Sequence, residues 1–450
     1  MKPNAPRWLS TPHRGLGRAR SHKMQQNSTR FVLLSFLVFT LGSSPAADPQ
    51  PRYFSVRPGV LAETKARLAA GDRTLQPAVS ALVQRAEEAL KVKPPSVTHK
   101  TRPAPSGSRH DYFSQAPYYW PDPARSNGLP YVARDGRVNP ESRTAASDEP
   151  RVRALGRTVE TLALAYYFTG KEAYAEHAAR CLRTWFLDPA TRMTPHLNHA
   201  QAVPGRNDGR GIGIIECGGI ISAAEAAGLL AGSPAWTAPE DQALKDWLAQ
   251  FLDWLLNSKN GREEAAMPQN HGTMYDVRVA TLALILDKPE LARQITEAAK
   301  QKRIAVQIEP DGRQPMELKR TKSFNYSRLN LCGLVALAGL ADRVGVDLWH
   351  YQTADGRSIR KALDFMLPYV KSPPAPWPYQ QIIPLDRAEL VDAFRSAALA
   401  YHEPAYAGVA AGFPGEERAL SQLLNPLPDD WVPVQPAARP PVKAGIPPAD

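Results

Sequence analysis

Two adjacent stretches decide the fold class: RALGRTVETLALAYYFTG, residues 153–170, and KEAYAEHAARCLRTWFLD, residues 171–188. Apolar residues recur in the first stretch at intervals of three and four, which is the period of one face of an α-helix. Gly170 is a typical helix stop. The two stretches therefore predict two helices joined by a short turn.

The same helical pattern recurs along most of the chain. It is present in residues 213–230, 239–258, 274–287, 289–308, 326–345, 358–370 and 385–401. No alternating run is long enough to nucleate a sheet, and no exact repeat is found. We therefore expect an all-α fold, an (α/α) toroid or incomplete barrel of antiparallel helix pairs. Two long segments without helical periodicity, residues 93–149 and 191–212, are expected to be loops that line a cleft.

The N-terminal segment predicts export. The apolar run FVLLSFLVFTL, residues 31–41, has 11 residues, follows Arg30 and precedes GSSPAAD. It is too short to span a bilayer and has the layout of a signal peptide. We predict a signal peptide over residues 1–46, with Met24 an equally good start, a toroid domain over 47–425 and a proline-rich tail over 426–450. The mature protein would be periplasmic or secreted, with no integral membrane segment.

Composition and charge narrow the class of partner. The chain is 43% hydrophobic, which is typical of a protein with a large buried core, and its net charge is +11. Removing the first 46 residues, which hold seven basic residues and no acidic ones, leaves +4. This charge suits an anionic polymer, and nucleic acid is disfavoured because no basic run or stacking module is present. The three cysteines, Cys181, Cys217 and Cys332, lie in apolar helical patterns, so we expect buried thiols.

Aromatic residues cluster in the first long loop, in HDYFSQAPYYWPDP, residues 110–123. Tyr118, Tyr119 and Trp120 could stack on the apolar faces of sugar rings. A packed surface loop is the alternative. The second loop enters a helix as NHAQAVPGRNDGRGIGIIE, residues 198–216. It could present His199, Gln201 and Arg206 to a polar ligand, or serve only as a glycine-rich turn.

Two further motifs place polar side chains at predicted helix starts. QNHGTMYD, residues 269–276, contains Asn270, His271 and Tyr275. An ordinary N-cap is the alternative, and zinc is disfavoured because a second histidine at the required spacing is missing. MELKRTKSFNYSRLNL, residues 316–331, places Arg320 and Tyr326 where a basic loop enters a helix. A solvated basic turn would have the same composition.

In this order, YWPDP with DGRVNPE, QAVPGRNDGRGIGIIE, QNHGTMYD and RTKSFNYS resemble the alginate lyase family of polysaccharide lyases. The resemblance extends from about Tyr53 to Arg395. It implies an (α/α) toroid with a deep cleft, export from the cytoplasm, an anionic polyuronate as substrate, and β-elimination with no cofactor and no metal. Two departures stand out: the lysine-rich lid signature is missing, and Asn325 replaces a second histidine.

The resemblance also implies roles for four catalytic residues. Asn270 and His271 would hydrogen-bond the uronate carboxylate, and Arg320 would supply positive charge. Tyr326 would take the C5 proton, return a proton to the O4 oxygen, or do both. Its pKa would need to be lowered by a cation, with Arg320 nearest and Arg328 or Lys322 as substitutes.

The remaining implied contacts are with neighbouring sugars. They would be made by Gln201, His199, Arg206, Tyr275 and the three aromatic residues of the first loop. The spacing from Arg320 to Tyr326 is one residue shorter than the family pattern, so Lys319 could stand in the place of the arginine.

Two other functions remain open from the residues alone. A glycoside hydrolase on a similar toroid would need two carboxylates across the scissile bond, and Asp111, Asp122, Asp208 and Asp276 could supply them. A non-catalytic uronate-binding protein would bind the polymer and release no product. Alginate, cleaved mainly at mannuronate, is the substrate that the resemblance favours.

Overall fold

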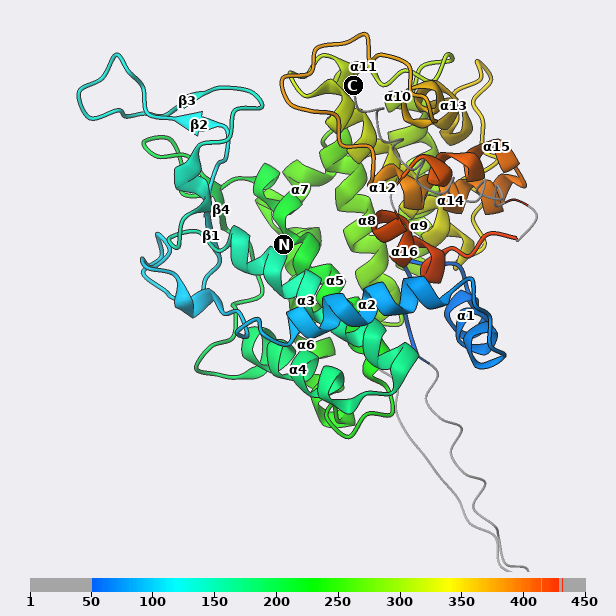
Figure 1. Cartoon of the computed structure of the whole chain (residues 1–450). Helices are drawn as coiled ribbons and strands as arrows, with labels where there is room; N and C mark the ends of the chain where they lie inside the picture. Colours follow the sequence, from blue (N-terminus) through cyan, green and yellow to red (C-terminus); the bar gives the residue numbers. More distant parts are fainter. Residues whose placement is uncertain (1–50, 414, 429–430, 432–450) are drawn as a thin grey trace, which may run out of the picture. The chain divides into compact units, whose positions relative to one another are not determined.

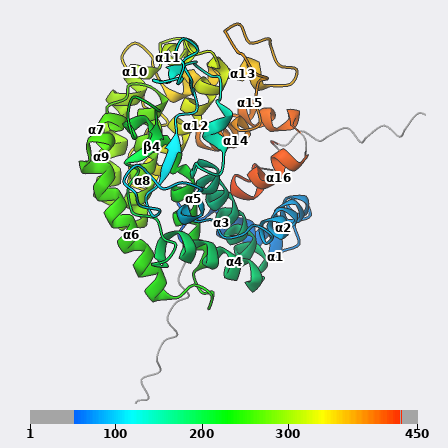
Figure 2. The same cartoon turned by 90° about the vertical axis from the view of Figure 1, so that its left-hand side faces the viewer.

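Helices dominate the part of the chain that this computed structural model describes, residues 51–413, 415–428 and 431 (Figures 1 and 2). The α-helices are α1 (Val60–Ala69), α2 (Gln76–Ala89), α3 (Glu149–Thr169), α4 (Glu172–Leu182), α5 (Gly218–Ala227), α6 (Ala238–Asn257), α7 (Lys259–Ala265), α8 (Asn270–Ile285), α9 (Pro289–Ala299), α10 (Ala305–Gln307), α11 (Pro315–Leu318), α12 (Ser323–Asp342), α13 (Ile359–Val370), α14 (Leu390–Tyr401), α15 (Pro404–Ala407) and α16 (Gly415–Leu424). All described residues belong to one unit, Asp48–Asp450. The predicted signal peptide, residues 1–46, lies outside the described residues, as does most of the predicted tail.

Tighter and wider helical turns extend several of these helices. The 3-10 turns are η1 (Val97–His99), η2 (Pro140–Arg143), η4 (Gly211–Cys217), η5 (Gly228–Leu230) and η7 (Gly408–Gly412), and the π-helical turns are η3 (Arg183–Leu187) and η6 (Lys300–Ile304). The η4 turn runs directly into α5.

The helices form a ring of neighbours. Along the ring, α2 packs on α3, α3 on α5, α5 on α8, α8 on α12, α12 on α14, α14 on α16, and α16 returns to α2. Helices α4, α6, α9 and α13 pack on members of this ring (Figure 2). The all-α toroid of helix pairs predicted from the sequence is therefore confirmed. Helices α2 and α16, which the periodicity did not predict, complete the ring.

Local sequence explains where several helices begin and end. α3 ends at Gly170, whose φ of 69° is left-handed, as its stop signal predicts. α6 begins with a capping box in which Thr237 and Glu240 satisfy each other's backbone N–H groups. The N-cap of α8 is Gln269, whose side chain accepts a hydrogen bond from the backbone N–H of His271. His271 is thereby fixed in the first turn of α8.

Close packing of α3 on α5 depends on glycine. A Cβ at Gly156 would lie 2.6 Å from the Cα of Gly219, so the two backbones approach without side chains between them. Apolar residues of α3, α5 and α6 form one buried cluster, and those of α8, α9 and α12 to α14 form a second. The cysteines are free thiols; Cys181 and Cys217 are buried as expected, and Cys332 is partly exposed.

Strands are short and lie in the two long loops. β1 (Phe113–Gln115) pairs in parallel with β4 (His199–Ala202), and β2 (Tyr119–Trp120) pairs antiparallel with β3 (Val132–Ala133). Figure 1 shows β2 and β3 in an arm that extends from the helices. These pairings fix the loops that hold the predicted aromatic and polar motifs.

One helical run in the described residues, Gly211–Leu230, is long and apolar enough to cross a membrane by length and composition. It comprises η4, α5 and η5, and 61% of its apolar window is buried inside the protein. A core helix of a soluble protein passes the same test, so this run is weak evidence for a membrane span.

Candidate active site

Tyr326 stands in the first turn of α12, between two polar neighbours. Its hydroxyl accepts a hydrogen bond of 2.9 Å from Arg320 Nη2 and donates one of 2.9 Å to the hydroxyl of Tyr118. The Arg320 guanidinium also lies 3.8 Å from the centre of the Tyr326 ring. The structure therefore brings Tyr118 to Arg320 and Tyr326, from which it lies about 200 residues away in the sequence. All three side chains are partly exposed.

The charge state of Tyr326 differs from the expectation. Burial and the neighbouring Tyr118 raise the pKa of Tyr326 well above its usual value, and Arg320 opposes this rise only in part. The expected lowering of the pKa by a cation is wrong for the unliganded protein. Tyr326 is thus a neutral phenol at physiological pH, and it holds a proton that it can donate.

Arg320, and not Lys319, occupies the cationic position. Arg320 Nη2 pairs with Asp135 Oδ1 at 2.6 Å and its side chain is 29% exposed, whereas Lys319 is exposed. Asp135 also accepts hydrogen bonds from the backbone N–H and the hydroxyl of Thr321. Arg320 and these hydrogen bonds lower the pKa of Asp135 to about 2, against the effect of burial. Asp135 follows β3, so this contact fastens the β2–β3 arm to the start of α12.

The other two cations that the sequence offered have different partners. Arg328 pairs with Asp386 and Glu389, and Lys322 lies over the ring of Tyr118. Neither contacts the Tyr326 hydroxyl.

His271 is held by a buried carboxylate. Its Nδ1 lies 2.7 Å from Oε1 of Glu264, which is at the end of α7 and 1% exposed. A carboxylate can only accept a hydrogen bond, so Nδ1 carries a proton and Nε2 is left for another partner. The imidazole is partly exposed. The geometry suits a histidine that is oriented to meet an anionic ligand.

Asn270 is held by a second buried carboxylate. Glu317 of α11 accepts hydrogen bonds from the backbone N–H of Asn270 at 2.8 Å and from its Nδ2 at 2.7 Å. Asn270 is 0% exposed, and its Oδ1 has no hydrogen-bond partner. Burial raises the pKa of Glu317. Because Glu317 lies three residues before Arg320, this contact joins the start of α8 to the loop of Arg320 and Tyr326.

Gln201 and the aromatic loop meet at Arg210. Gln201 Oε1 accepts a 2.9 Å hydrogen bond from Arg210 Nη2, and the guanidinium lies 5.0 Å from the centre of the Tyr119 ring. Gln201 has a φ of 50°, an uncommon backbone conformation for a residue other than glycine. Trp120 donates a hydrogen bond to the backbone of Arg137. Tyr119 and Trp120 are partly exposed, so both rings can contact a ligand.

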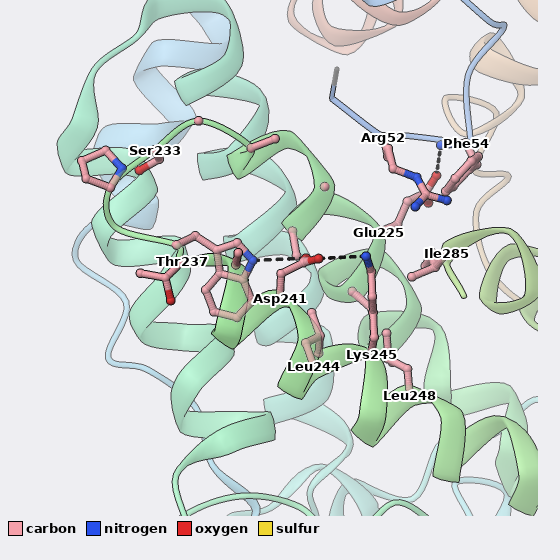
Figure 3. Close-up of a pocket in the computed structure, with 18 residues that line it drawn as sticks. Arg52, Phe54, Glu225, Ser233, Thr237, Asp241, Leu244, Lys245, Leu248 and Ile285 are labelled. Carbon is pink, nitrogen blue, oxygen red and sulfur yellow. Dashed lines mark hydrogen bonds and ion pairs between the residues drawn. The ribbon is translucent and has the colours of Figure 1, made fainter. Parts of the chain in front are cut away.

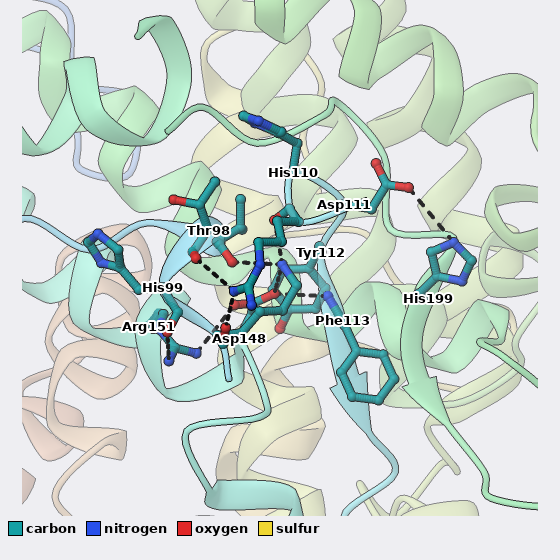
Figure 4. A network of polar contacts seen from close by, with 12 residues as sticks. Thr98, His99, His110, Asp111, Tyr112, Phe113, Asp148, Arg151 and His199 are labelled. Carbon is teal, nitrogen blue, oxygen red and sulfur yellow. Dashed lines mark hydrogen bonds and ion pairs between the residues drawn. The ribbon is translucent and has the colours of Figure 1, made fainter. Parts of the chain in front are cut away.

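Three predicted contact residues lie apart from Tyr326. His199 faces Asp111 at 3.9 Å (Figure 4). Arg206 is exposed and donates a hydrogen bond to the backbone of Tyr131. Tyr275 is 4% exposed, packs in the hydrophobic core and donates a hydrogen bond to the carbonyl of Leu255. We therefore leave Tyr275 out of the proposed ligand contacts, because its side chain is buried in the hydrophobic core.

Unsatisfied polar atoms gather around His271. Arg210 Nε, Glu264 Oε2, Asn270 Oδ1 and Arg278 Nε are buried and have no hydrogen-bond partner among the described residues. Gly211 lies against the α7 turn that carries Glu264, which places the preceding Arg210 at the same turn. Buried polar atoms rarely remain unpaired in native proteins. The presence of several such atoms around His271 indicates a binding site for a polar ligand or for water.

Three of the four aspartates that a hydrolase could use form hydrogen bonds or ion pairs with other residues. Asp276 is buried and pairs with Arg303, Asp111 accepts a hydrogen bond from Ser106, and Asp122 accepts one from the backbone of Ala124. Asp208 is exposed. Among the described residues, no group of three or more His, Cys, Asp or Glu side chains is arranged to hold a metal ion.

A separate cavity lies between the N-terminal segment, α5 and α6 (Figure 3). It has a volume of about 530 Å³ and is lined mainly by apolar side chains, with Arg52 and the ion pair between Lys245 and Asp241 among them. None of its lining residues is among the candidates for catalysis.

The partly exposed carboxyl of Glu216, which hydrogen-bonds to Ser114 of β1, gives the protein a pH-dependent stability. Glu216 accepts hydrogen bonds from the hydroxyls of Tyr112 and Ser114, and burial raises its pKa to about 7. The folded state therefore binds this proton more tightly than the unfolded chain does. The stabilisation is complete below the unfolded pKa of about 4.5 and is lost as the pH rises through about 7.

We expect Glu216→Gln to reduce this loss of stability between about pH 5.5 and pH 8 by about 1 to 3 kcal/mol. Urea unfolding of both proteins at the two pH values measures the difference. Glu290→Gln, at an exposed ion pair of α9, is the control. Equal slopes in wild type and Glu216→Gln would contradict the prediction.

Several site residues could not be found from the sequence. Glu264, Glu317, Asp135, Arg210 and Arg278 carry no motif of their own, and each acts through a neighbour that is distant along the chain. The only available signal was that Glu317, Arg210 and Asp135 lie inside stretches already selected for other reasons.

Comparisons with known proteins identify the family of the chain. The family model for alginate lyase matches residues 96–377. An alginate lyase from Bacteroides ovatus is 36% identical, with a TM-score of 0.79, over 84% of this chain and 99% of that one. Alginate lyase A1-III from Sphingomonas species A1 is 18% identical, with a TM-score of 0.51, over 86% and 100%, which supports the fold alone.

A histidine-to-alanine variant of the Sphingomonas enzyme, complexed with a tetrasaccharide, has a TM-score of 0.53 at 18% identity over 86% of this chain and 99% of that one. No curated protein sequence matches the chain at a significant level. The family model covers more than half of the chain, and the Bacteroides protein matches almost end to end. The chain therefore belongs to the alginate lyase family and is a polysaccharide lyase.

Proposed function

We propose that the protein cleaves alginate by β-elimination, mainly at mannuronate residues, and leaves an unsaturated uronate at the new end. The observation that carries this proposal is the neutral phenol of Tyr326, held between Arg320 and Tyr118 beside the start of α8. In support, the Bacteroides relative is an alginate lyase, and the Sphingomonas variants bind a tetrasaccharide.

The proposed reaction begins with the substrate carboxylate. The C5 proton of a uronate is only weakly acidic, so its removal requires stabilisation of the negative charge that develops on the carboxylate. His271 donates a hydrogen bond to this group from Nε2 when its imidazole carries a proton on both nitrogens, because the proton on Nδ1 is already donated to Glu264, whose carboxylate stabilises this cation. Asn270 Oδ1 and Nδ2 lie in the same turn, and its amide would need to exchange its bond to Glu317 for one to the substrate.

A neutral Tyr326 can complete the proton transfers alone. Its oxygen takes the C5 proton while its own proton passes to O4, the C4–O4 bond breaks, and a double bond forms between C4 and C5. The phenol is neutral before and after this exchange, which agrees with its raised pKa. The exchange requires the C5 proton and O4 to lie on the same face of the sugar, as they do in mannuronate. In guluronate they lie on opposite faces.

The partner is accordingly an anionic polysaccharide, bound by the arginines and aromatic rings around Tyr326. The enzyme would encounter such a polymer outside the cytoplasm. We therefore place the enzyme in the periplasm or the medium, in line with the signal peptide expected over residues 1–46.

The test is the ultraviolet absorbance of the unsaturated product. We expect the mature protein to give the fastest rise with polymannuronate, a slower rise with polyguluronate or glucuronan, and the same rates with a chelator present. Reducing ends that form without absorbance would mean hydrolysis. A preference for polyguluronate would contradict the single-face mechanism.

A further inference from the structure

Helix α8 reaches solvent along a single stripe. Of its residues from Asn270 to Ile285, only His271, Met274 and Arg278 are partly exposed, and all others are buried. Positions separated by three and seven residues lie on one face of an α-helix. Arg278 therefore faces the same space as His271, two turns farther along the helix.

Arg278 has no anionic partner there. Within residues 51–413 and 415–428, no carboxylate forms an ion pair with it, and its buried Nε has no hydrogen-bond partner. The side chain that it reaches is the thiol of Cys217, a weak acceptor. Among other arginines close to the site, Arg303 pairs with Asp276 and Arg328 with Asp386, whereas Arg210 donates a hydrogen bond to Gln201. An unpaired guanidinium that is partly withdrawn from water is costly unless an anion meets it.

The position of the guanidinium depends on a glycine. A Cβ at Gly218, the first residue of α5, would lie 2.8 Å from Arg278 Nη2. α5 packs against α8, so the missing side chain makes room for the guanidinium between the two helices. On the other side, Gly333 of α12 lies against Met274. Gly218 of α5 and Gly333 of α12 thus leave space beside the partly exposed residues of α8.

We propose that Arg278 binds the carboxylate of a second uronate residue in the same polymer chain as the residue held at His271. Seven helical residues separate the two side chains by about 10 Å along α8, a length on the order of two sugar units. Arg278 supplies a rigid fork of donors that matches a carboxylate. This inference rests on the proposed function and adds a subsite to it.

The subsite has a direct consequence for substrate length. An oligouronate long enough to reach Arg278 gains one charge-assisted contact, whereas a disaccharide held at His271 does not. The enzyme should therefore discriminate between oligomers by length, and Arg278 should account for part of the difference.

The test is equilibrium binding of saturated oligomannuronates of two to six sugars, measured by calorimetry in the Tyr326→Phe background so that no product forms. We expect Arg278→Ala to weaken binding of the longer oligomers roughly tenfold and to leave the disaccharide unchanged. Gly218→Ala keeps the arginine and displaces it, so it should give a similar loss. Arg293→Ala, which removes a charge from the exposed face of α9, should bind as the parent does.

Two outcomes would overturn the inference. If Arg278→Ala binds oligomers of every length with the affinity of the parent, the arginine has only a structural role. An equal loss at every length, the disaccharide included, would place Arg278 at the reacting sugar. If the wild-type enzyme forms unsaturated product while the variants bind normally, the proposed function stands and only the subsite is wrong. If wild type forms no such product and binds no oligouronate, both fail together.

Discussion

Tyr326→Phe is expected to lower kcat on polymannuronate by a factor of about 10³, because the phenol is the only group proposed to move both protons. The hydroxyl that is lost makes two hydrogen bonds, to Arg320 and to Tyr118. Both partners remain partly exposed and can bond to water, so the variant should fold with a Tm close to that of wild type. KM should change little, because the carboxylate is held elsewhere. Product absorbance under saturating polymer measures the effect.

The matched control is Tyr351→Phe, which removes a hydroxyl that accepts a hydrogen bond from Gln301 far from the site. It should keep full activity. A Tyr326→Phe enzyme with activity within threefold of wild type would show that another group carries the protons. Spectrophotometric titration adds a second check: because burial raises the pKa of Tyr326, no phenolate should form from it at neutral pH.

His271→Ala is expected to lower kcat/KM by a factor of about 10² to 10³, the usual effect of removing one donor to a developing oxyanion. Its Nε2 is the donor proposed for the substrate carboxylate, and Glu264 orients the ring through Nδ1. Glu264→Gln should have a smaller effect in the same direction. The glutamine amide has nearly the same shape, but it lacks the charge that stabilises a protonated imidazole.

These enzymes are compared by initial rates on polymannuronate, with the Tm recorded for each variant. His350→Ala is the control, since that histidine is exposed and pairs only with Asp347. An unchanged rate in His271→Ala would remove the histidine from the mechanism. A fall in Tm with a normal rate per folded molecule in Glu264→Gln would make Glu264 a structural residue only.

The arm that carries β2 and β3 shows how the site depends on tertiary contacts. Asp135 fastens this arm to Arg320 and Thr321, and Gly136 lies so close to Thr321 that a side chain there would collide with it. Tyr118, at the base of the same arm, makes its hydrogen bond to Tyr326. The sequence predicted each of the two tyrosines as a site residue, yet nothing in their local sequences predicts that their hydroxyls touch.

The pairing of Glu264 and Glu317 with site residues could not be predicted from the sequence either. Glu264 and Glu317 lie seven and 47 residues from the side chains that they hold, on α7 and α11. Their spacing matches no local motif, because the hydrogen bonds form between separate helices. Arg278 could not be predicted as a site residue either, because in the sequence it is one polar residue in a mainly apolar helical pattern.

The sequence by itself determined the all-helical class, because helical periodicity and stops such as Gly170 are local properties of the chain. Through the resemblance of its short motifs to the alginate lyase family, it also predicted four catalytic candidates, Asn270, His271, Arg320 and Tyr326, with Lys319 left as an alternative to Arg320. Only the tertiary structure decided which cation meets Tyr326, that burial holds its phenol neutral, and that Tyr275 belongs to the core. Charge state and contact depend on burial and on neighbours brought together by the ring of helices, and these are fixed only when the whole chain has folded.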